Sequence, residues 1–323
     1  MRERCVLVLV VLLAAACGGG GSPQSPTPAS TPPPNALAAG SEISVVSGET
    51  GQPIAGARLA LGPEALSTDA GGRAVTTRPV TWGSLVDVVA PGFFDRQTIL
   101  RKGGTTRFLL WPRTTSTGLD EEFTRQMVYT WAAADPGQIG KDPLERIAVG
   151  ATEAVVALSD ELRLDEKAEQ AHAEAVAEMN AWIGARVRYV LAPQGPRQGL
   201  VFEARVDPAD EACKPRVLAV FRGRWNSRRE IAGGQIIYCT LAAARTNTVL
   251  HELGHSAGLQ HVYSSRHEVM AAYAYYMREI AFSEREGLVL NLLFERPFGN
   301  RFPDSDRETS AAGGGGGFTI ACP

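Results

Sequence analysis

The 323-residue sequence predicts a multidomain protein in which an N-terminal all-β sandwich precedes an α+β domain. Short β-prone runs separated by turn residues fill residues 41–112, and no helical periodicity interrupts them. Helical and strand-like patterns then alternate over residues 117–310. The composition, 44% hydrophobic and 21% charged, is that of a globular protein rather than a disordered or fibrous one.

The first domain is expected to be a small antiparallel sandwich, because its strands are short and glycine or proline separates them. The expected strands are Ile43–Val46, Ala57–Leu61, Leu85–Val89, Thr98–Leu100 and Thr106–Trp111. The segments 51–57 (GQPIAGA), 68–72 (TDAGG) and 90–93 (APGF) together resemble a carboxypeptidase regulatory-like, transthyretin-like domain. This domain shows no catalytic constellation. We favour a spacer function for it, with a ligand-binding module as the alternative.

The second domain is expected to order its elements as helix, strands and a helix that carries histidines. The expected helices cover residues 119–133, 165–183, a segment starting at Thr246 or Asn247, and 281–296. The expected strands are Ala154–Leu158, Val187–Leu191, Val201–Val206, Val217–Phe221 and Gly234–Cys239. Thr246 or Asn247 is a suitable N-cap for the third helix. Residues 311–323 are expected to form a flexible, glycine-rich tail.

The histidines gather in one segment, since four of the five lie between residues 251 and 267. His251 and His255 are four residues apart, so on a helix both imidazoles face one side and can bind one metal. His261 is the third ligand if the chain turns after the helix, and Gly258 lies where that turn is needed. Three protein ligands are the number that catalytic zinc sites use. Glu252 follows His251 and can act as general base on water.

Residues 251–261 read HELGHSAGLQH and fill every fixed position of HExxHxxGxxH, the pattern of metzincin zinc peptidases. The chain from about residue 117 to 305 therefore resembles a metzincin catalytic domain. The resemblance implies one catalytic Zn²⁺, a methionine turn at Met270 beneath it, and a substrate peptide extended along an edge strand. Tyr273 is a candidate for stabilising the transition state. His267 is expected at the surface or behind the ligands.

The N-terminus predicts export. Arg2 and Arg4 precede an apolar run over residues 6–16, which is too short to span a bilayer and has the length of a signal-peptide core. The run ends in LAAAC (13–17), which resembles a bacterial lipobox, except that the leucine lies four residues before the cysteine instead of three. Residues 1–16 are thus expected to be a lipoprotein signal peptide and Cys17 the lipidated residue. The alternative is an ordinary secretory signal that is cleaved near Ala16.

Residues 17–40 then form a Gly/Ser/Pro-rich linker, which is suited to a tether. We expect a protein anchored through Cys17 to the outer membrane or cell surface, where it faces the periplasm or the exterior. Oxidising conditions there permit one disulfide among Cys213, Cys239 and Cys322, and the sequence leaves the pair open. No metal role is expected for these cysteines, because their spacing does not match a thiolate site.

The leading functional hypothesis is a zinc endopeptidase acting on extracytoplasmic proteins or peptides. The first alternative is a surface binding or adhesion lipoprotein with a structural zinc site. The second is a processing enzyme with a single partner protein. A net charge of −3 without a long basic run gives no indication of nucleic-acid binding. The sequence leaves the oligomeric state open.

Overall fold

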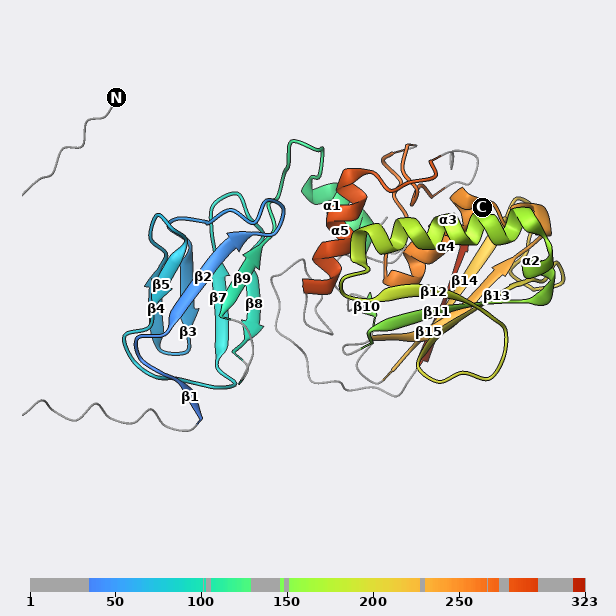
Figure 1. Ribbon diagram of the computed structural model, residues 1–323. Coiled ribbons are helices and arrows are strands. Elements are labelled where there is room, and N and C mark those ends of the chain that lie inside the picture. Colours follow the sequence, from blue (N-terminus) through green and yellow to red (C-terminus); the bar gives the residue numbers. More distant parts are fainter. Residues whose placement is uncertain are drawn as a thin grey trace, which may run out of the picture. The chain divides into compact units, whose positions relative to one another are not determined.

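The computed structural model describes residues 35–100, 102, 106–128, 146–147, 151–226, 230–265, 267–272, 279–295 and 316–322. Over these residues the chain is mixed α/β: a β-rich part is followed by a part that combines helices with a sheet (Figure 1). The coarse prediction of a β-rich domain is confirmed. Among the described residues, no helix is long and apolar enough to cross a membrane.

The β-rich part holds two sheets and a short ribbon. Its strands are β1 (Ala36–Leu37), β2 (Glu42–Ser47), β3 (Arg58–Leu61), β4 (Glu64–Ser67), β5 (Arg73–Val75), β6 (Val80–Thr81), β7 (Leu85–Val89), β8 (Arg96–Ile99) and β9 (Arg107–Leu110). One sheet has the order β5-β2-β9 and the other β4-β3-β7-β8, while β1 pairs with β6. Side chains alternate between core and solvent along β3 and β7, and residues of both sheets share one hydrophobic core.

The prediction of a purely antiparallel sandwich is wrong in one pair. Strands β2 and β9 run parallel, with Ser44 opposite Arg107 and Ser47 opposite Leu110. Parallel neighbours need a long crossover connection, and here the strands from β3 to β8 supply it. Sequence patterns within single strands do not report such long-range pairing.

The second part contains one sheet with the order β12-β11-β13-β15-β14-β16, and β10 pairs with the start of β15. Its strands are β10 (Arg146–Ile147), β11 (Glu153–Leu158), β12 (Arg188–Pro193), β13 (Leu200–Val206), β14 (Ala219–Trp225), β15 (Glu230–Tyr238) and β16 (Gly316–Cys322). The pairs from β12 to β15 are parallel, whereas β14 runs antiparallel to both of its neighbours.

The helices are α1 (Glu121–Val128), α2 (Asp160–Leu164), α3 (Glu166–Ile183), α4 (Thr246–Ala257) and α5 (Glu284–Glu295). Asp165 caps α3, since its side chain accepts a hydrogen bond from the Ala168 N–H at 2.9 Å. The expected cap of α4 is wrong, because Arg245 occupies the N-cap position without a side-chain cap. The Thr246 hydroxyl instead donates to Glu174 on α3 at 2.7 Å.

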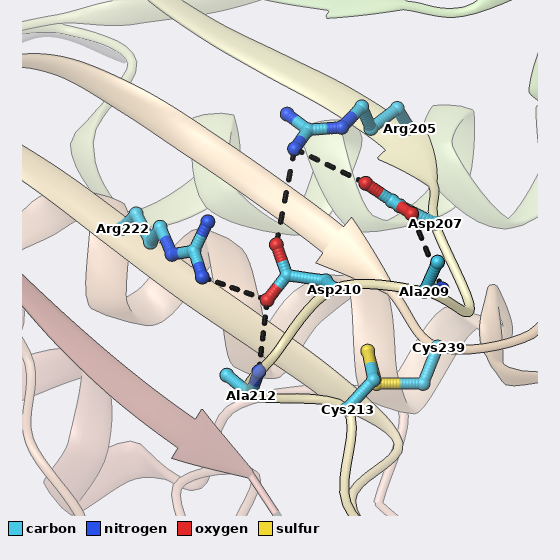
Figure 2. Close-up of a disulfide and its surroundings, with 8 residues drawn as sticks. All are labelled: Arg205, Asp207, Ala209, Asp210, Ala212, Cys213, Arg222 and Cys239. Atoms are coloured by element: carbon cyan, nitrogen blue, oxygen red, sulfur yellow. Dashed lines mark hydrogen bonds and ion pairs between the residues drawn. A yellow bond between two sulfur atoms is a disulfide. The ribbon is translucent and has the colours of Figure 1, made fainter.

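The loop from β13 to β14 is held by a disulfide between Cys213 and Cys239, which resolves the pairing that the sequence left open. Figure 2 shows this bond beside Asp210, whose carboxylate accepts from Arg222 at 2.7 Å and lies 3.9 Å from Arg205. The loop that leads into β14 is thereby fixed to the neighbouring strands.

The expectation of a flexible tail at residues 311–323 is wrong for Gly316–Cys322, which form strand β16 on the outer edge of β14. Glycine is rare in strands because it weakens them, so composition favoured a flexible segment. Two long-range contacts stabilise the strand, and composition reveals neither of them. One is the backbone ladder with β14, and the other is the ring of Phe318, which stacks on Trp225 at 5.1 Å between centroids.

His172 links α3 to β15 in the core. The side chain is fully buried, its Nδ1 lies 2.7 Å from the Ala168 carbonyl, and the Tyr238 hydroxyl lies 3.1 Å from its Nε2. These contacts fit a neutral imidazole that donates through Nδ1 and accepts at Nε2. Burial lowers the pKa of His172 to about 4, against 6.5 for an exposed imidazole.

We therefore predict that His172 weakens the fold in acid. The unfolded imidazole takes up a proton below about pH 6.5 and the folded one only near 4, so stability falls by about 3 kcal/mol as the pH drops through this window. In His172→Gln that loss should be absent. Urea unfolding at several pH values measures it, with the exposed His267→Gln as control. Identical pH dependence in both variants would contradict the prediction.

Candidate metal centre

Helix α4 carries the histidines into the interior. Thr248 to Ala257 are all buried, so the helix has no solvent face along the motif. It ends at Gly258, which has a φ of +106°, the left-handed conformation that glycine adopts without a Cβ clash. The Gly258 N–H donates to His255 O and the Leu259 N–H to Gly254 O, each at 3.0 Å. This turn brings His261 back towards the helix.

Three imidazole nitrogens converge at the end of this helix. The Nε2 atoms of His251 and His255 lie 3.1 Å apart, those of His251 and His261 3.1 Å, and those of His255 and His261 3.2 Å. His251 and His255 are fully buried, and His261 is 8% exposed. The structure thus brings together the three residues that the motif singles out.

The outer nitrogens of two of these rings fix their tautomers. His251 Nδ1 lies 2.6 Å from the Val269 carbonyl, and His255 Nδ1 lies 2.8 Å from the Leu259 carbonyl. A carbonyl only accepts, so each Nδ1 carries the proton and each Nε2 presents a lone pair to the centre. Burial lowers the pKa of His251 to about 4 and that of His261 to about 3, and it also lowers that of His255. All three are neutral at pH 7, the form that binds metals.

Cys322 completes the group, and this corrects the expectation that no cysteine has a metal role. Its Sγ lies 3.4 Å from His255 Nε2 and 3.6 Å from His261 Nε2, and the residue is 1% exposed. Among the described residues it is the free cysteine, because Cys213 and Cys239 are bonded to each other. The spacing argument failed because Cys322 joins histidines rather than other cysteines, across 61 residues of chain.

The four side chains could hold one metal ion. Their ligand atoms all lie within 4.8 Å of one another. Tetrahedral zinc with bonds of about 2.05 Å to nitrogen and 2.3 Å to sulfur implies separations of about 3.3 Å between nitrogens and about 3.6 Å from nitrogen to sulfur. Five of the six separations are close to these values, and the sixth, from Cys322 Sγ to His251 Nε2, is within 4.8 Å. Several lone pairs facing one another in a dry site are repulsive unless a cation lies between them, so the donor set fits a metal.

Glu252 lies beside this group. The residue is fully buried, and neither carboxylate oxygen has a hydrogen-bond partner other than the Cys322 thiol among the described residues. Burial raises the pKa of Glu252 to about 8, which the nearby Cys322 thiol partly opposes. The Cys322 thiol is thus the neighbouring donor of this buried carboxyl, and no other described group bonds to it.

Met270 packs directly beneath the helix. A Cβ added at Gly254 would overlap the sulfur of Met270, so glycine allows the methionine to lie against the helix backbone. The Met270 carbonyl accepts from Val262 N–H at 2.8 Å, which joins its turn to the segment after His261. Glu286 of α5 accepts from the Met270 N–H at 2.8 Å. The turn is therefore fixed both to the ligand segment and to α5.

Other expected site residues lie elsewhere. His267 is exposed and takes no part in the cluster, as expected for a residue at the surface. Tyr273 and Cys17 lie outside the described residues. The residue that sequence reasoning missed is Cys322, and its only signal was the odd number of cysteines left after export, which implied one unpaired thiol.

We predict that His261→Ala weakens metal binding by more than about 100-fold, because loss of a ligand exceeds the effect of changing an outer partner. His267→Ala, which removes an exposed histidine 6 residues further on, should bind as tightly as the wild type. Competition with a chelating dye of known zinc affinity measures both. Equal affinity of the two variants would show that His261 is not a ligand.

Comparisons with known proteins assign neither a family nor a function to the chain. No protein-family model matches the chain, and a search of curated proteins finds no similar sequence.

Proposed function

We propose that this protein is a metzincin-type zinc endopeptidase that hydrolyses peptide bonds in extracytoplasmic proteins or peptides. The observation that carries the proposal is the fully buried carboxylate of Glu252 beside three converging imidazoles. A purely structural site has no use for such a carboxylate. The HExxHxxGxxH motif supports the same proposal, and so does the position of Met270 beneath the helix.

The histidines would hold the metal, and Glu252 would handle the protons. A zinc ion in such a site supplies Lewis acidity, which polarises a carbonyl group and makes water more acidic. Glu252 can take a proton from the attacking water onto a carboxylate oxygen and then deliver it to the leaving amine. The dry surroundings of the carboxylate favour this transfer, because its basicity is raised when solvent is absent.

Without β16, the sheet would offer a binding edge for an extended peptide at β14. Strand β14 lies at the outside of the strands that precede the histidine helix, and it contacts α4. A peptide that adds to such an edge uses main-chain hydrogen bonds for affinity and leaves alternate side chains for specificity. This supports action on unfolded or extended segments. Tyr273 is proposed as an additional stabiliser of the transition state.

The proposal includes anchoring to the outer membrane or cell surface. It is supported by the apolar run and the LAAAC segment at residues 13–17, followed by the Gly/Ser/Pro-rich linker. The β-rich part would then act as a carboxypeptidase regulatory-like spacer between the lipid at Cys17 and the peptidase domain.

One observation favours a second candidate, a surface binding lipoprotein with a structural zinc site. Structural zinc sites are closed by four protein ligands, and Cys322 supplies a fourth here. The peptidase requires Glu252 as its general base, whereas a structural zinc site does not require it.

We predict that cleavage of a diverse peptide mixture, read by mass spectrometry, depends on Glu252. Glu252→Gln has nearly the same shape and cannot accept the proton, so cleavage should fall by at least about 100-fold. The wild type and Glu252→Gln are each tested with Cys322 intact and with Cys322→Ser, because the Cys322 sulfur lies in the same site. A chelator should abolish all cuts. If zinc is stoichiometric and no protein cuts, the structural-site candidate replaces the peptidase. Equal cleavage by Glu252→Gln and the wild type would contradict the role of Glu252 as general base.

A further inference from the structure

Strand β16 ends inside the metal centre. Its backbone pairs with β14 over all seven residues, from Gly316 opposite Trp225 to Cys322 opposite Ala219. Only Cys322 of these seven residues is buried, and the other six are exposed or half-buried. The strand therefore contributes one interior side chain, and that side chain is the sulfur that faces the histidines.

We propose that this protein inhibits itself. Strand β16 occupies the substrate edge of β14, and Cys322 takes the fourth ligand position of the metal. The folded protein is therefore inactive until β16 leaves. This inference rests on the proposed peptidase function. It concerns the regulation of that same site and adds a ligand to it.

The fourth position matters because catalytic zinc sites use three protein ligands and leave the fourth open for water and substrate. With Cys322 Sγ 3.4 Å from His255 Nε2 and 3.6 Å from His261 Nε2, the sulfur lies where that open position would be. A thiol binds zinc as a thiolate, so coordination releases one proton and leaves no position for water. Hydrolysis then requires that the sulfur leave first.

The same strand blocks the peptide. The outward backbone groups of β14, which a substrate would need, already pair with β16 in an antiparallel ladder. Phe318 to Ala321 also line one side of a 460 Å³ pocket whose other side is formed by Gln260, His261 and Tyr263. The buried Glu252 and the ligands are at most 8% exposed. A peptide carbonyl therefore cannot reach the site while the strand is in place.

Strand β16 can detach while the rest of the sheet keeps its structure. It is held to the sheet by the ladder, by the ring of Phe318 against Trp225 and Phe221, by Ile320, which packs against the core from a half-buried position, and by the sulfur. Gly223 of β14 lies opposite Phe318 and leaves room for that ring, because a Cβ there would overlap it. The edge beneath is fixed independently: β14 pairs with β15 along its whole length, and Leu218 O accepts from the N–H of disulfide-bonded Cys239 at 2.9 Å. The Leu218 N–H donates to Cys322 O at 2.9 Å and would lose this partner with the strand. Removal of β16 therefore leaves β14 in place.

The test compares the full-length wild type with Cys322→Ser and with Ala321→Ser. The control introduces the same hydroxyl one residue earlier on the same strand, at an exposed position. Each protein is loaded with Co²⁺, whose bond to a thiolate gives a charge-transfer band in the near ultraviolet. We expect the band in the wild type and in Ala321→Ser, and its loss in Cys322→Ser. Absence of the band in a wild type that binds Co²⁺ would overturn the assignment of Cys322 as a ligand.

Cleavage of the peptide mixture by the zinc-loaded proteins gives the second readout. A tethered segment has an effective concentration in the millimolar range, so it competes strongly with micromolar peptide. Cys322→Ser should therefore cut at least about tenfold faster than the wild type, while Ala321→Ser should not. Phe318→Ala, which keeps the sulfur and loosens the strand, should also cut faster than the wild type. Phe318→Ala therefore still tests self-inhibition if Cys322→Ser does not fold.

These experiments distinguish a failure of self-inhibition from a failure of the proposed peptidase function. Equal cleavage by the wild type, Cys322→Ser and Phe318→Ala would overturn self-inhibition and leave the peptidase intact. A thiolate band in the wild type without cleavage by any folded variant would overturn self-inhibition together with the proposed function, in favour of a closed structural site.

Discussion

The convergence of three imidazole nitrogens in a dry interior is the constraint on which the helix-bearing part of the structure depends. Lone pairs at 3.1–3.2 Å repel one another in a low dielectric, so the arrangement is suited to a cation held in a rigid frame. The frame consists of backbone carbonyls that hold the outer ring nitrogens of His251 and His255. The turn at Gly258 and the packing of Met270 under Gly254 complete it. Each element serves to keep donor atoms at distances that suit a metal.

The position of the sheet relative to the histidine helix gives the site a second property. The parallel strands β12, β11, β13 and β15 form the support, and the antiparallel β14 adds an edge at the side where the ligands converge. A disulfide and the ion pairs of Asp210 fix the loop that enters β14 (Figure 2). A well-fixed edge of this kind can pair with an extended segment. In this structure the chain's own last strand takes that place.

Sequence reasoning succeeded where the information is local. The motif at residues 251–261 contains the three converging histidines, Glu252 and the turn residue within eleven consecutive positions, so one helix and one glycine suffice to place them. It failed where the information is long-range. The pairing of β2 with β9 and of β16 with β14 joins segments far apart in the chain, and a glycine-rich strand has no propensity of its own. Cys322 was missed for the same reason, since only tertiary structure brings it to His261.

X-ray absorption at the zinc edge of the purified, zinc-loaded wild type tests the central claim most directly, because it counts the nitrogen and sulfur ligands of the metal. The account predicts three nitrogen ligands and one sulfur at about 2.3 Å. A first shell of nitrogen and oxygen without sulfur would contradict the closed site that His251, His255, His261 and Cys322 form here.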